Sequence, residues 1–411
     1  MIKILNKCQV ANTNDLKEVI NLGDIALVNN FQKNKKKSLK QKKYPLKLNY
    51  SKSSKLIQIN SVISKEILFP KEYPYTSSNT KILRDNFTEL AKNVKKKIQL
   101  TSKDVVMDIG CNDGNLLKNF LDTSKTLGIS PENIIKQAKK LGINIIQSYF
   151  DKKAVIKIKK KFENIKVITA TNVFAHIDNV NELIKNIKKC LDKDGILVTE
   201  SHYAGSVING MQYDTIYHEH LRYYSLRSLN YIFRKHGLKI FDFEMIKTHG
   251  GSIRVYCCNK KSKKYKVYKK KIDKTIRNEK RTLNISNFNK YKKKVENNKK
   301  NILNTLTKIK SANKTVFGVG APSRAATLIN FCSINSNLIN NILEISGSYK
   351  IGKYMPGTDI KVLDENYGLS KKPDYLFLFS WHIAEELVKS LRKKGFKGKF
   401  IVPLPKVRIL K

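Results

Sequence analysis

Residues 105–114 read VVMDIGCNDG, and this stretch decides the fold because it leads from a buried strand into a glycine turn. Apolar β-rich runs and segments with helical periodicity alternate around it, and Pro131 marks the first turn of one such helix. The runs lie at residues 125–129, 143–146, 166–170 and 195–200, and the helical segments at residues 82–98, 132–141 and 180–191. Strands that alternate with helices predict an α/β domain whose parallel sheet carries helices on both faces.

The glycine turn favours S-adenosylmethionine (SAM) as its ligand. Gly110 and Gly114 lie four positions apart, so the three-glycine pattern of dinucleotide-binding turns is absent. Asp108 and Asp113 flank the turn, where they would repel a pyrophosphate but attract the sulfonium and ammonium groups of SAM. The alternative is an ordinary strand–helix turn with a capping Asp. We therefore expect a SAM site at the end of this strand.

The second strand lacks the acidic residue that usually accompanies such a turn. A carboxylate at this place binds both ribose hydroxyls, but residues 127–131 read LGISP and Ser130 occupies the position. One hydroxyl makes a single hydrogen bond to the ribose instead of a bidentate pair. The loss of a charge-assisted bond costs about 1.5–3 kcal/mol of binding free energy, so the sequence predicts weakened SAM binding.

The pattern along the chain predicts a division into domains. Residues 1–80 show little periodicity and predict a small irregular N-terminal flap domain. Residues 81–258 contain the glycine turn and close with two further strands. Residues 259–313 are dominated by Lys and Asn and predict one or two exposed helices that bridge domains. Residues 314–411 resume the alternation and predict a second, smaller α/β domain.

Composition narrows the class of protein. The chain has 411 residues, 41% of them hydrophobic, which excludes wholesale disorder, and it has no run of about 18 apolar residues that would span a membrane. It carries 81 Lys and Arg against 33 Asp and Glu, for a net charge of +48. These basic residues are nearly all Lys and are spread along the chain, which favours solvated faces, with nucleic-acid binding as an alternative. Six Cys without a disulfide pattern predict a cytoplasmic location.

A histidine-rich segment follows the fifth strand, at the sheet edge where open α/β proteins bind ligands. Residues 211–224 read MQYDTIYHEHLRYY, and His218 and His220 around Glu219 suggest proton transfer. Three further groups are candidates to converge there: His176, His202 and Tyr75. Metal binding by His218 and His220 is an alternative, although the helical spacing H-x-x-x-H is missing. A polar loop whose histidines are satisfied by hydrogen bonds is the other alternative.

Several blocks, in order, resemble one family. They are YPYTSS at 73–78, DIGCNDG at 108–114, NVFAHI at 172–177, YDTIYHEH at 213–220, HGGSIR at 249–254, GVGAPSR at 318–324, GKYMPGT at 352–358 and KPDY at 372–375. Through nearly the whole chain the sequence is similar to SAM-dependent sugar C-methyltransferases that act on nucleotide-linked 4-keto-6-deoxy sugars. The resemblance implies a class I SAM-methyltransferase domain with a Rossmann-like fold, followed by a second Rossmann-like C-terminal domain.

The resemblance also implies roles for individual residues. His220 is the expected base that removes the proton next to the ketone, Glu219 and Tyr217 position the sugar and stabilise the enolate oxygen, and His176 and Tyr75 line the active site. SAM is expected on Asp108, Gly110, Asn112, Asp113, Gly114, Ser130 and Asn172. The nucleotide diphosphate is expected on Ser323, Arg324, Lys353 and Tyr354, where helix amides and basic groups meet a pyrophosphate.

The N-terminal domain departs from the family. Relatives carry a zinc site of two Cys-x-x-Cys pairs, whereas this chain keeps Cys8 and has Ala11, Ser51 and Ser54 at the other positions. One thiolate does not make a tetrahedral structural zinc site, so we expect no zinc and a flap held by packing alone. Because of these departures, two alternatives stay open: a SAM-dependent methyltransferase for another small-molecule acceptor, and a non-catalytic descendant of the family.

Overall fold

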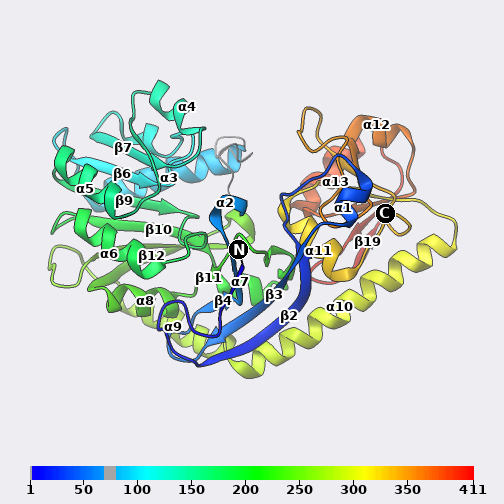
Figure 1. Cartoon of the computed structure of the whole chain (residues 1–411), viewed down its shortest axis with the longest axis horizontal. Helices are drawn as coiled ribbons and strands as arrows, with labels where there is room; N and C mark the ends of the chain where they lie inside the picture. The colour runs from blue at the N-terminus through cyan, green and yellow to red at the C-terminus, as the bar shows by residue number, and fades with distance from the viewer. Residues whose placement is uncertain (1, 69–79) are drawn as a thin grey trace.

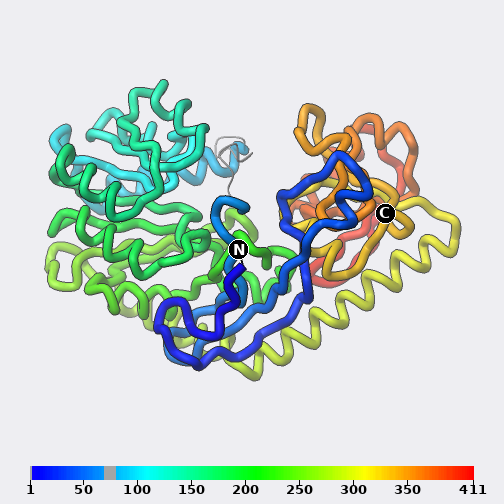
Figure 2. The backbone as a smooth tube through the Cα atoms, in the orientation of Figure 1, coloured from blue at the N-terminus to red at the C-terminus, as the bar shows by residue number. Residues whose placement is uncertain are grey.

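The computed structural model describes residues 2–68 and 80–411. Figure 1 shows two sheet-containing lobes, with the N-terminal strands and a long helix running beneath and between them. The tube in Figure 2 shows that the first part of the chain reaches from one lobe to the other. No helix among the described residues is long and apolar enough to cross a membrane.

The first lobe is built on a seven-stranded sheet in the order β12-β13-β10-β9-β6-β7-β8. The strands are β6 (Val105–Ile109), β7 (Lys125–Ser130), β8 (Asn144–Gln147), β9 (Ile165–Thr171), β10 (Ile196–His202), β12 (Leu238–Ile246) and β13 (Ser252–Asn259). β13 runs antiparallel to β10 and β12, whereas β10, β9, β6, β7 and β8 run parallel to one another. This is the class I SAM-methyltransferase arrangement, and it confirms the predicted fold.

Side chains alternate between the two faces of this sheet and bury both. Met107 and Ile109 pack with helices α5 (Lys152–Lys161), α6 (Val180–Cys190) and α8 (Leu226–Lys235). On the other face, Val106 packs with α3 (Lys81–Lys97), the 3₁₀ turn η2 (Leu117–Phe120) and α4 (Ile135–Lys140). The helix expected at 132–141 begins only at Ile135, and its N-cap residue Ile134 offers no side-chain cap. The glycine turn likewise leads into a 3₁₀ turn instead of a full helix.

The N-terminal domain holds more regular structure than the sequence predicts. Strands β2 (Leu16–Ala26) and β3 (Lys43–Ser51) form a long hairpin in a four-stranded sheet of order β11-β4-β3-β2, completed by β4 (Ile57–Ile59) and β11 (Arg222–Tyr223). Smaller elements complete the domain: β1 (Ile2–Ile4), β5 (Ser61–Ile63), α1 (Lys35–Leu39) and α2 (Lys65–Leu68). Register shifts between Glu18 and Ile20 and between Asn21 and Asp24 interrupt the hairpin. These bulges break the two-residue periodicity, which explains the expectation of an irregular domain.

The C-terminal lobe is a six-stranded sheet in the order β16-β15-β14-β17-β18-β19. Its elements are β14 (Val316–Val319), α11 (Ser323–Cys332), β15 (Asn341–Glu344), β16 (Lys361–Asp364), α12 (Glu365–Ser370), β17 (Tyr375–Leu378), α13 (Ala384–Lys393), β18 (Lys399–Val402) and β19 (Arg408–Leu410). All neighbouring strands are parallel except β18 and β19. The predicted second Rossmann-like sheet is therefore present.

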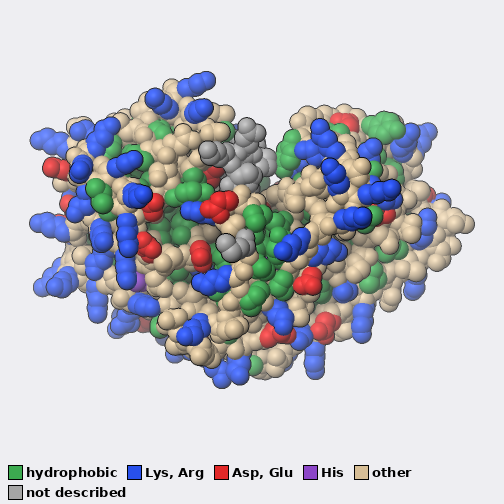
Figure 3. All heavy atoms as spheres, in the orientation of Figure 1, with side chains coloured by type: hydrophobic (Ala, Val, Ile, Leu, Met, Phe, Trp, Pro, Cys, Tyr) green, Lys and Arg blue, Asp and Glu red, His purple; other side chains and the backbone are tan. Residues whose placement is uncertain are grey.

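Two helices connect the lobes, as expected from the Lys-rich segment. They are α9 (Lys269–Thr282) and α10 (Ile285–Ser311), and in Figure 1 α10 runs from below the middle of the molecule along the C-terminal lobe. Helix α10 is exposed on one side only, because Phe288, Val295 and Ile302 enter the core shared with β2 and the C-terminal sheet. In Figure 3 the Lys and Arg side chains are scattered over both lobes of the visible face and form no single patch there.

Candidate active site

The glycine turn after β6 is shaped by residues in the left-handed region. Gly110 and Gly114 have φ of 76° and 81°, and Asn112 has φ of 50°. A Cβ on Gly110 would lie 2.6 Å from Val173 Cγ2, so glycine is required by packing as well as by conformation. The Gly110 amide donates to the Ile129 carbonyl at 2.7 Å, which holds the turn against the end of β7. Because the two glycines carry no Cβ, the turn fits the close approach of a nucleoside ligand.

The two aspartates of the turn have different surroundings. Asp108 is 3% exposed, and its carboxyl group accepts a hydrogen bond from the Thr169 hydroxyl at 2.6 Å. Burial raises the pKa of Asp108 to about 7, against the lowering effect of that hydrogen bond. Asp113 accepts from the Asn115 amide at 3.2 Å. A bound cation would favour the charged form of Asp108, so both residues fit a ligand that carries a sulfonium and an ammonium group.

A third carboxylate, Glu132, lies at the end of β7 and was missed by the sequence analysis. The buried Ser130 hydroxyl donates a hydrogen bond to the Glu132 carboxylate. Directly after β9, on the other side of β6, Asn172 has φ of 57° and its amide donates to the Glu200 carbonyl at 2.7 Å. All SAM-binding residues expected from the sequence therefore lie at the carboxyl ends of β6, β7 and β9.

The expected base lies within a cluster of imidazoles at the same edge, the histidine cluster, formed by His176, His202, His220 and His249. The Tyr217 hydroxyl and His220 Nε2 are 3.2 Å apart, and their rings are 4.2 Å apart between centroids. The rings of His176 and His220 are 5.0 Å apart. His176 Nδ1 donates to the Glu219 carbonyl at 2.8 Å, so the segment after β10 is tied to the segment after β9.

Burial keeps this cluster in its neutral form. It lowers the pKa of His176 to about 4 and that of His202 to about 3. The pKa of His220 falls well below its usual value, first because of burial and then because of the charges of His176, His202 and His249. His220 therefore offers an unprotonated imidazole at physiological pH.

His218 lies apart from this cluster. It is 1% exposed and its ring is 5.9 Å from that of Tyr44 on β3, so it packs against the N-terminal hairpin. Burial lowers its pKa to about 4. Metal binding by His218 and His220 together finds no support, since the described part of the chain contains no metal-binding group of three His, Cys, Asp or Glu. Tyr75, the remaining expected site residue, lies outside the described residues.

Glu219 points toward the C-terminal lobe through a residue that the sequence analysis missed. Asn29 Nδ2 donates to Glu219 Oε1 at 2.7 Å, and Asn29 Oδ1 accepts from the Ser323 hydroxyl at 3.2 Å. Burial, together with the Glu219 charge, raises the pKa of Tyr349 to about 12. One asparagine of the N-terminal domain thus joins the segment that carries Glu219 and His220 to the turn between β14 and α11.

The residues expected to hold a diphosphate lie along this same boundary. Arg324 Nη1 donates to His382 Nδ1 at 3.0 Å and lies 3.8 Å from the buried Asp214 carboxylate, which also accepts from Trp381 Nε1 at 2.7 Å. The Lys353 ammonium lies 4.8 Å from the centre of the Tyr349 ring. The Tyr354 amide donates to the Gln32 carbonyl at 2.8 Å.

A cavity of about 990 Å³ opens beside His382 and the turn between β12 and β13. Its charged lining residues are all basic: Lys247, Lys274, Arg277 and Arg281. Gln212 also lines the cavity, accepts a hydrogen bond from His202 Nε2 at 3.3 Å and donates to the Gly250 carbonyl at 2.6 Å. The cavity is therefore separated from the histidine cluster by one side chain, and its charge suits an anion.

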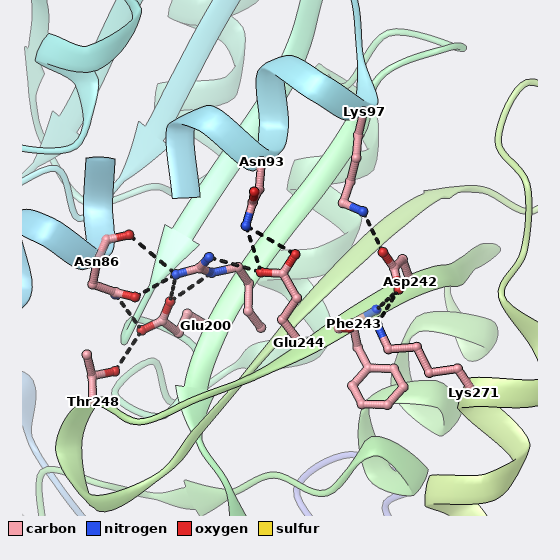
Figure 4. A network of polar contacts seen from close by, with 10 residues as sticks. Asn86, Asn93, Lys97, Glu200, Asp242, Phe243, Glu244, Thr248 and Lys271 are labelled. Atoms are coloured by element: carbon pink, nitrogen blue, oxygen red, sulfur yellow. Dashed lines mark hydrogen bonds and ion pairs between the residues drawn. The ribbon is translucent and has the colours of Figure 1, made fainter. Parts of the chain in front are cut away.

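A buried ionic network supports the floor of the site (Figure 4). Arg254 and Glu200 are both fully buried and form an ion pair with an Nη2–Oε2 distance of 2.9 Å. Arg254 also donates to Glu244 at 3.1 Å and to Asn86 Oδ1 at 2.7 Å. Thr248 donates to Glu200 Oε1 at 3.2 Å, which fixes the turn that carries His249. The network thus joins α3, β10 and that turn.

The N-terminal domain contains a second polar cluster, the turn cluster, formed by Cys8, Asp15, Ser51 and Ser54. Cys8 Sγ lies 3.1 Å from Ser54 Oγ, and it accepts from the Ala11 amide at 3.3 Å. Ser51 Oγ donates to Asp15 at 3.0 Å and accepts from the Ser54 amide at 3.3 Å. The four positions of a zinc site therefore lie together, but one thiol and two hydroxyls do not fit a structural zinc ion.

Comparisons with known proteins place each part of the chain. Residues 8–69 match a family model described as "Putative zinc binding domain", residues 77–242 match a methyltransferase domain, and residues 247–405 match a C-methyltransferase C-terminal domain. The chain is 26% identical to C-methyltransferase NovU of Streptomyces niveus over 418 residues, which cover 100% of this chain and 98% of the relative.

Two similar solved structures each cover less than half of this chain. A SAM-dependent methyltransferase from Clostridium acetobutylicum has a TM-score of 0.34 and 12% identity, and the match covers 44% of this chain and 93% of that one. A magnesium protoporphyrin IX methyltransferase from Synechocystis with bound SAM has a TM-score of 0.33 and 10% identity, over 43% of this chain and 79% of that one.

Proposed function

We propose that the chain is a SAM-dependent C-methyltransferase whose acceptor is a nucleotide-linked 4-keto-6-deoxy sugar, methylated through an enolate at the carbon next to the ketone. The matches to a methyltransferase domain, to a C-methyltransferase C-terminal domain and to a C-methyltransferase along the whole chain support this proposal. The observation that carries this proposal is the grouping of Tyr217, Glu219 and His220 beside His176. These residues lie at the carboxyl edge of the sheet, next to the strands that carry the glycine turn.

In this mechanism the protein moves one proton and stabilises one charge. A neutral imidazole at His220 takes the proton from the carbon next to the ketone, and the electron pair of the broken C–H bond delocalises onto the ketone oxygen. Tyr217 and Glu219 hold the sugar so that the developing negative charge faces a hydroxyl group. When bound, SAM supplies an electrophilic methyl group to the carbon of the enolate.

Two sets of residues hold the ligands. SAM is held by the glycine turn and the neighbouring strand ends: Asp108, Gly110, Asn112, Asp113, Gly114, Ser130 and Asn172. The nucleotide diphosphate is held at the start of α11, whose N-cap Pro322 leaves the first amides without a side-chain partner. Ser323 and Arg324 lie at this helix start, and Lys353 and Tyr354 lie on the loop packed beside it.

The direct test is a transfer assay. Purified protein is incubated with SAM and a panel of thymidine, uridine, cytidine and guanosine diphosphate 4-keto-6-deoxyhexoses, and each product is weighed by mass spectrometry. We expect one sugar nucleotide to gain the mass of one methyl group, on a carbon next to the ketone. Transfer to an oxygen, or transfer only to acceptors without a nucleotide, would contradict the proposal.

The alternatives predict other outcomes of the same experiment. A methyltransferase for a different metabolite binds SAM but leaves every sugar nucleotide unchanged. A non-catalytic descendant binds ligands without turnover, and the joint presence of Tyr217, Glu219 and His220 speaks against it. A nucleic-acid binder would show steeply salt-dependent binding to DNA or RNA. The six cysteines, all unpaired and buried, support the cytoplasmic location expected for such an enzyme.

A further inference from the structure

We propose that Glu132 provides the carboxylate that binds the ribose hydroxyls of SAM, in place of the acidic residue that is missing at position 130. The inference rests on the proposed SAM-binding role of the glycine turn, and it changes the expectation of weak binding drawn from Ser130. It assigns the ribose contact to a residue two positions further along the chain.

The turn after β7 brings Glu132 back to the strand end. β7 ends at Ser130, and α4 begins only at Ile135, so residues 131–134 form a turn instead of the first turn of a helix. Within that turn the Glu132 carboxylate accepts a hydrogen bond from the Ser130 hydroxyl. The charge therefore lies at the end of the strand, where the acidic side chain of position 130 would have placed it.

Glu132 also lies close to the glycine turn. The pKa of the Cys111 thiol is raised well above its usual value, chiefly by burial, and the charges of Asp108 and Glu132 raise it further. Cys111 directly follows Gly110, and its amide points to the Ile129 carbonyl at 3.4 Å. The carboxylates of Asp108 and Glu132, from the ends of β6 and β7, therefore lie near the glycine turn at which SAM is proposed to bind.

The chemistry of this pair suits a vicinal diol. A carboxylate offers two oxygens and about four acceptor sites, and Ser130 occupies one of them. Among the described residues, no other group donates a hydrogen bond to the Glu132 carboxylate, and the side chain is partly exposed. Two hydroxyl donors from a ribose would complete the acceptor set, and Ser130 would act as a positioning residue that fixes the carboxylate.

The test measures cofactor binding alone, by titration calorimetry with S-adenosylhomocysteine and its 2′-deoxy analogue. Because charge-assisted hydrogen bonds are lost, we expect Glu132→Gln to raise the Kd for S-adenosylhomocysteine about ten- to a hundredfold. In the unchanged protein the 2′-deoxy analogue should bind much more weakly than the parent compound, whereas in Glu132→Gln the two ligands should bind almost equally. Glu163→Gln, an exposed carboxylate of the same domain, is the matched control and should change neither Kd.

A relocation variant keeps the test independent of folding defects. Ser130→Glu combined with Glu132→Ala returns the carboxylate to the strand end, and it should recover most of the affinity lost in Glu132→Gln. Unchanged binding by Glu132→Gln, or a full 2′-deoxy penalty in that variant, would overturn the proposal. These titrations contain no acceptor sugar nucleotide. A negative result on Glu132 therefore does not test the proposed acceptor, and a failure to methylate the panel of sugar nucleotides does not change the binding result.

Discussion

Two polar clusters of the molecule differ in what they contain. In the turn cluster of the N-terminal domain Cys8 contacts Ser54, and in the histidine cluster at the edge of the seven-stranded sheet His176 contacts His220. Both pairs join segments that are far apart in sequence. The turn cluster has lost most of the groups that a metal needs, and hydrogen bonds among Ser51, Ser54 and Asp15 hold it together. The histidine cluster has kept its groups, and burial sets their protonation. The difference indicates that hydrogen bonds hold the turn cluster together without a metal, whereas the histidine cluster groups the side chains that the proposed proton transfer requires.

The largest expected effect on stability comes from breaking the buried ion pair between Arg254 and Glu200. Arg254→Met leaves the Glu200 carboxylate buried without its partner, so we expect a loss of about 3–5 kcal/mol in the free energy of unfolding. Urea denaturation measures this change, and Arg234→Met on the surface of α8 is the control, with an expected change within about 0.5 kcal/mol. Adding Glu200→Leu to Arg254→Met should restore much of the stability. A small effect of Arg254→Met alone would show that the network does not support the site.

A smaller effect is expected from pH. His218 and His202 have pKa values of about 4 and about 3 in the folded protein. In the unfolded chain they titrate near 6.5, so the unfolded state binds more protons between these values and stability falls as the pH falls below 6.5. At pH 5 each group costs up to about 2 kcal/mol.

Denaturation curves at pH 7.5 and pH 5.0 check this prediction. His218→Gln should reduce the pH dependence of the free energy of unfolding, whereas His236→Gln, which replaces a partly exposed imidazole at the end of α8, should reduce it less. If His218→Gln leaves the pH dependence unchanged, burial does not hold this imidazole neutral in the folded protein.

The smallest effect is expected when metal is removed. Because hydrogen bonds replace ligands in the turn cluster, a chelator should leave the Tm unchanged, and elemental analysis should find no stoichiometric zinc. The triple variant Ala11→Cys, Ser51→Cys and Ser54→Cys, together with Cys8, should bind zinc and lose stability on chelation. A chelator-sensitive Tm in the unchanged protein would contradict the assignment.

The sequence was most informative where strands are buried on both faces. The runs around Val106, Val167 and Val198 became central strands because continuous apolar segments have no stable place except inside a sheet. The N-terminal hairpin was less predictable, since its bulges near Ile20 and Asp24 hide the alternation. Strand β11, which pairs with β4 in the same sheet, comes from residues more than a hundred positions away, and no local sequence pattern predicts such a pairing.

The sequence was sufficient to predict the candidate site residues that lie in one short segment, but not the contacts that they make with distant parts of the chain. Glu219 and His220 stand in one short segment, so their spacing was visible in the sequence. The contact of Asn29 with Glu219 spans 190 positions and depends on how the hairpin packs. The sequence shows that Glu132 lies two positions after Ser130, where the usual acidic residue is missing. Its hydrogen bond with Ser130 was not predictable, because it depends on the late start of α4.

The central claim is that His220 removes the proton next to the ketone. The most direct measurement is deuterium exchange at that carbon, followed by NMR in D₂O with the methylatable sugar nucleotide and S-adenosylhomocysteine, so that no transfer takes place. The unchanged protein and His236→Asn should exchange the proton, and His220→Asn should bind S-adenosylhomocysteine normally but exchange it at least about a hundredfold more slowly. Exchange at the full rate in His220→Asn would contradict the account.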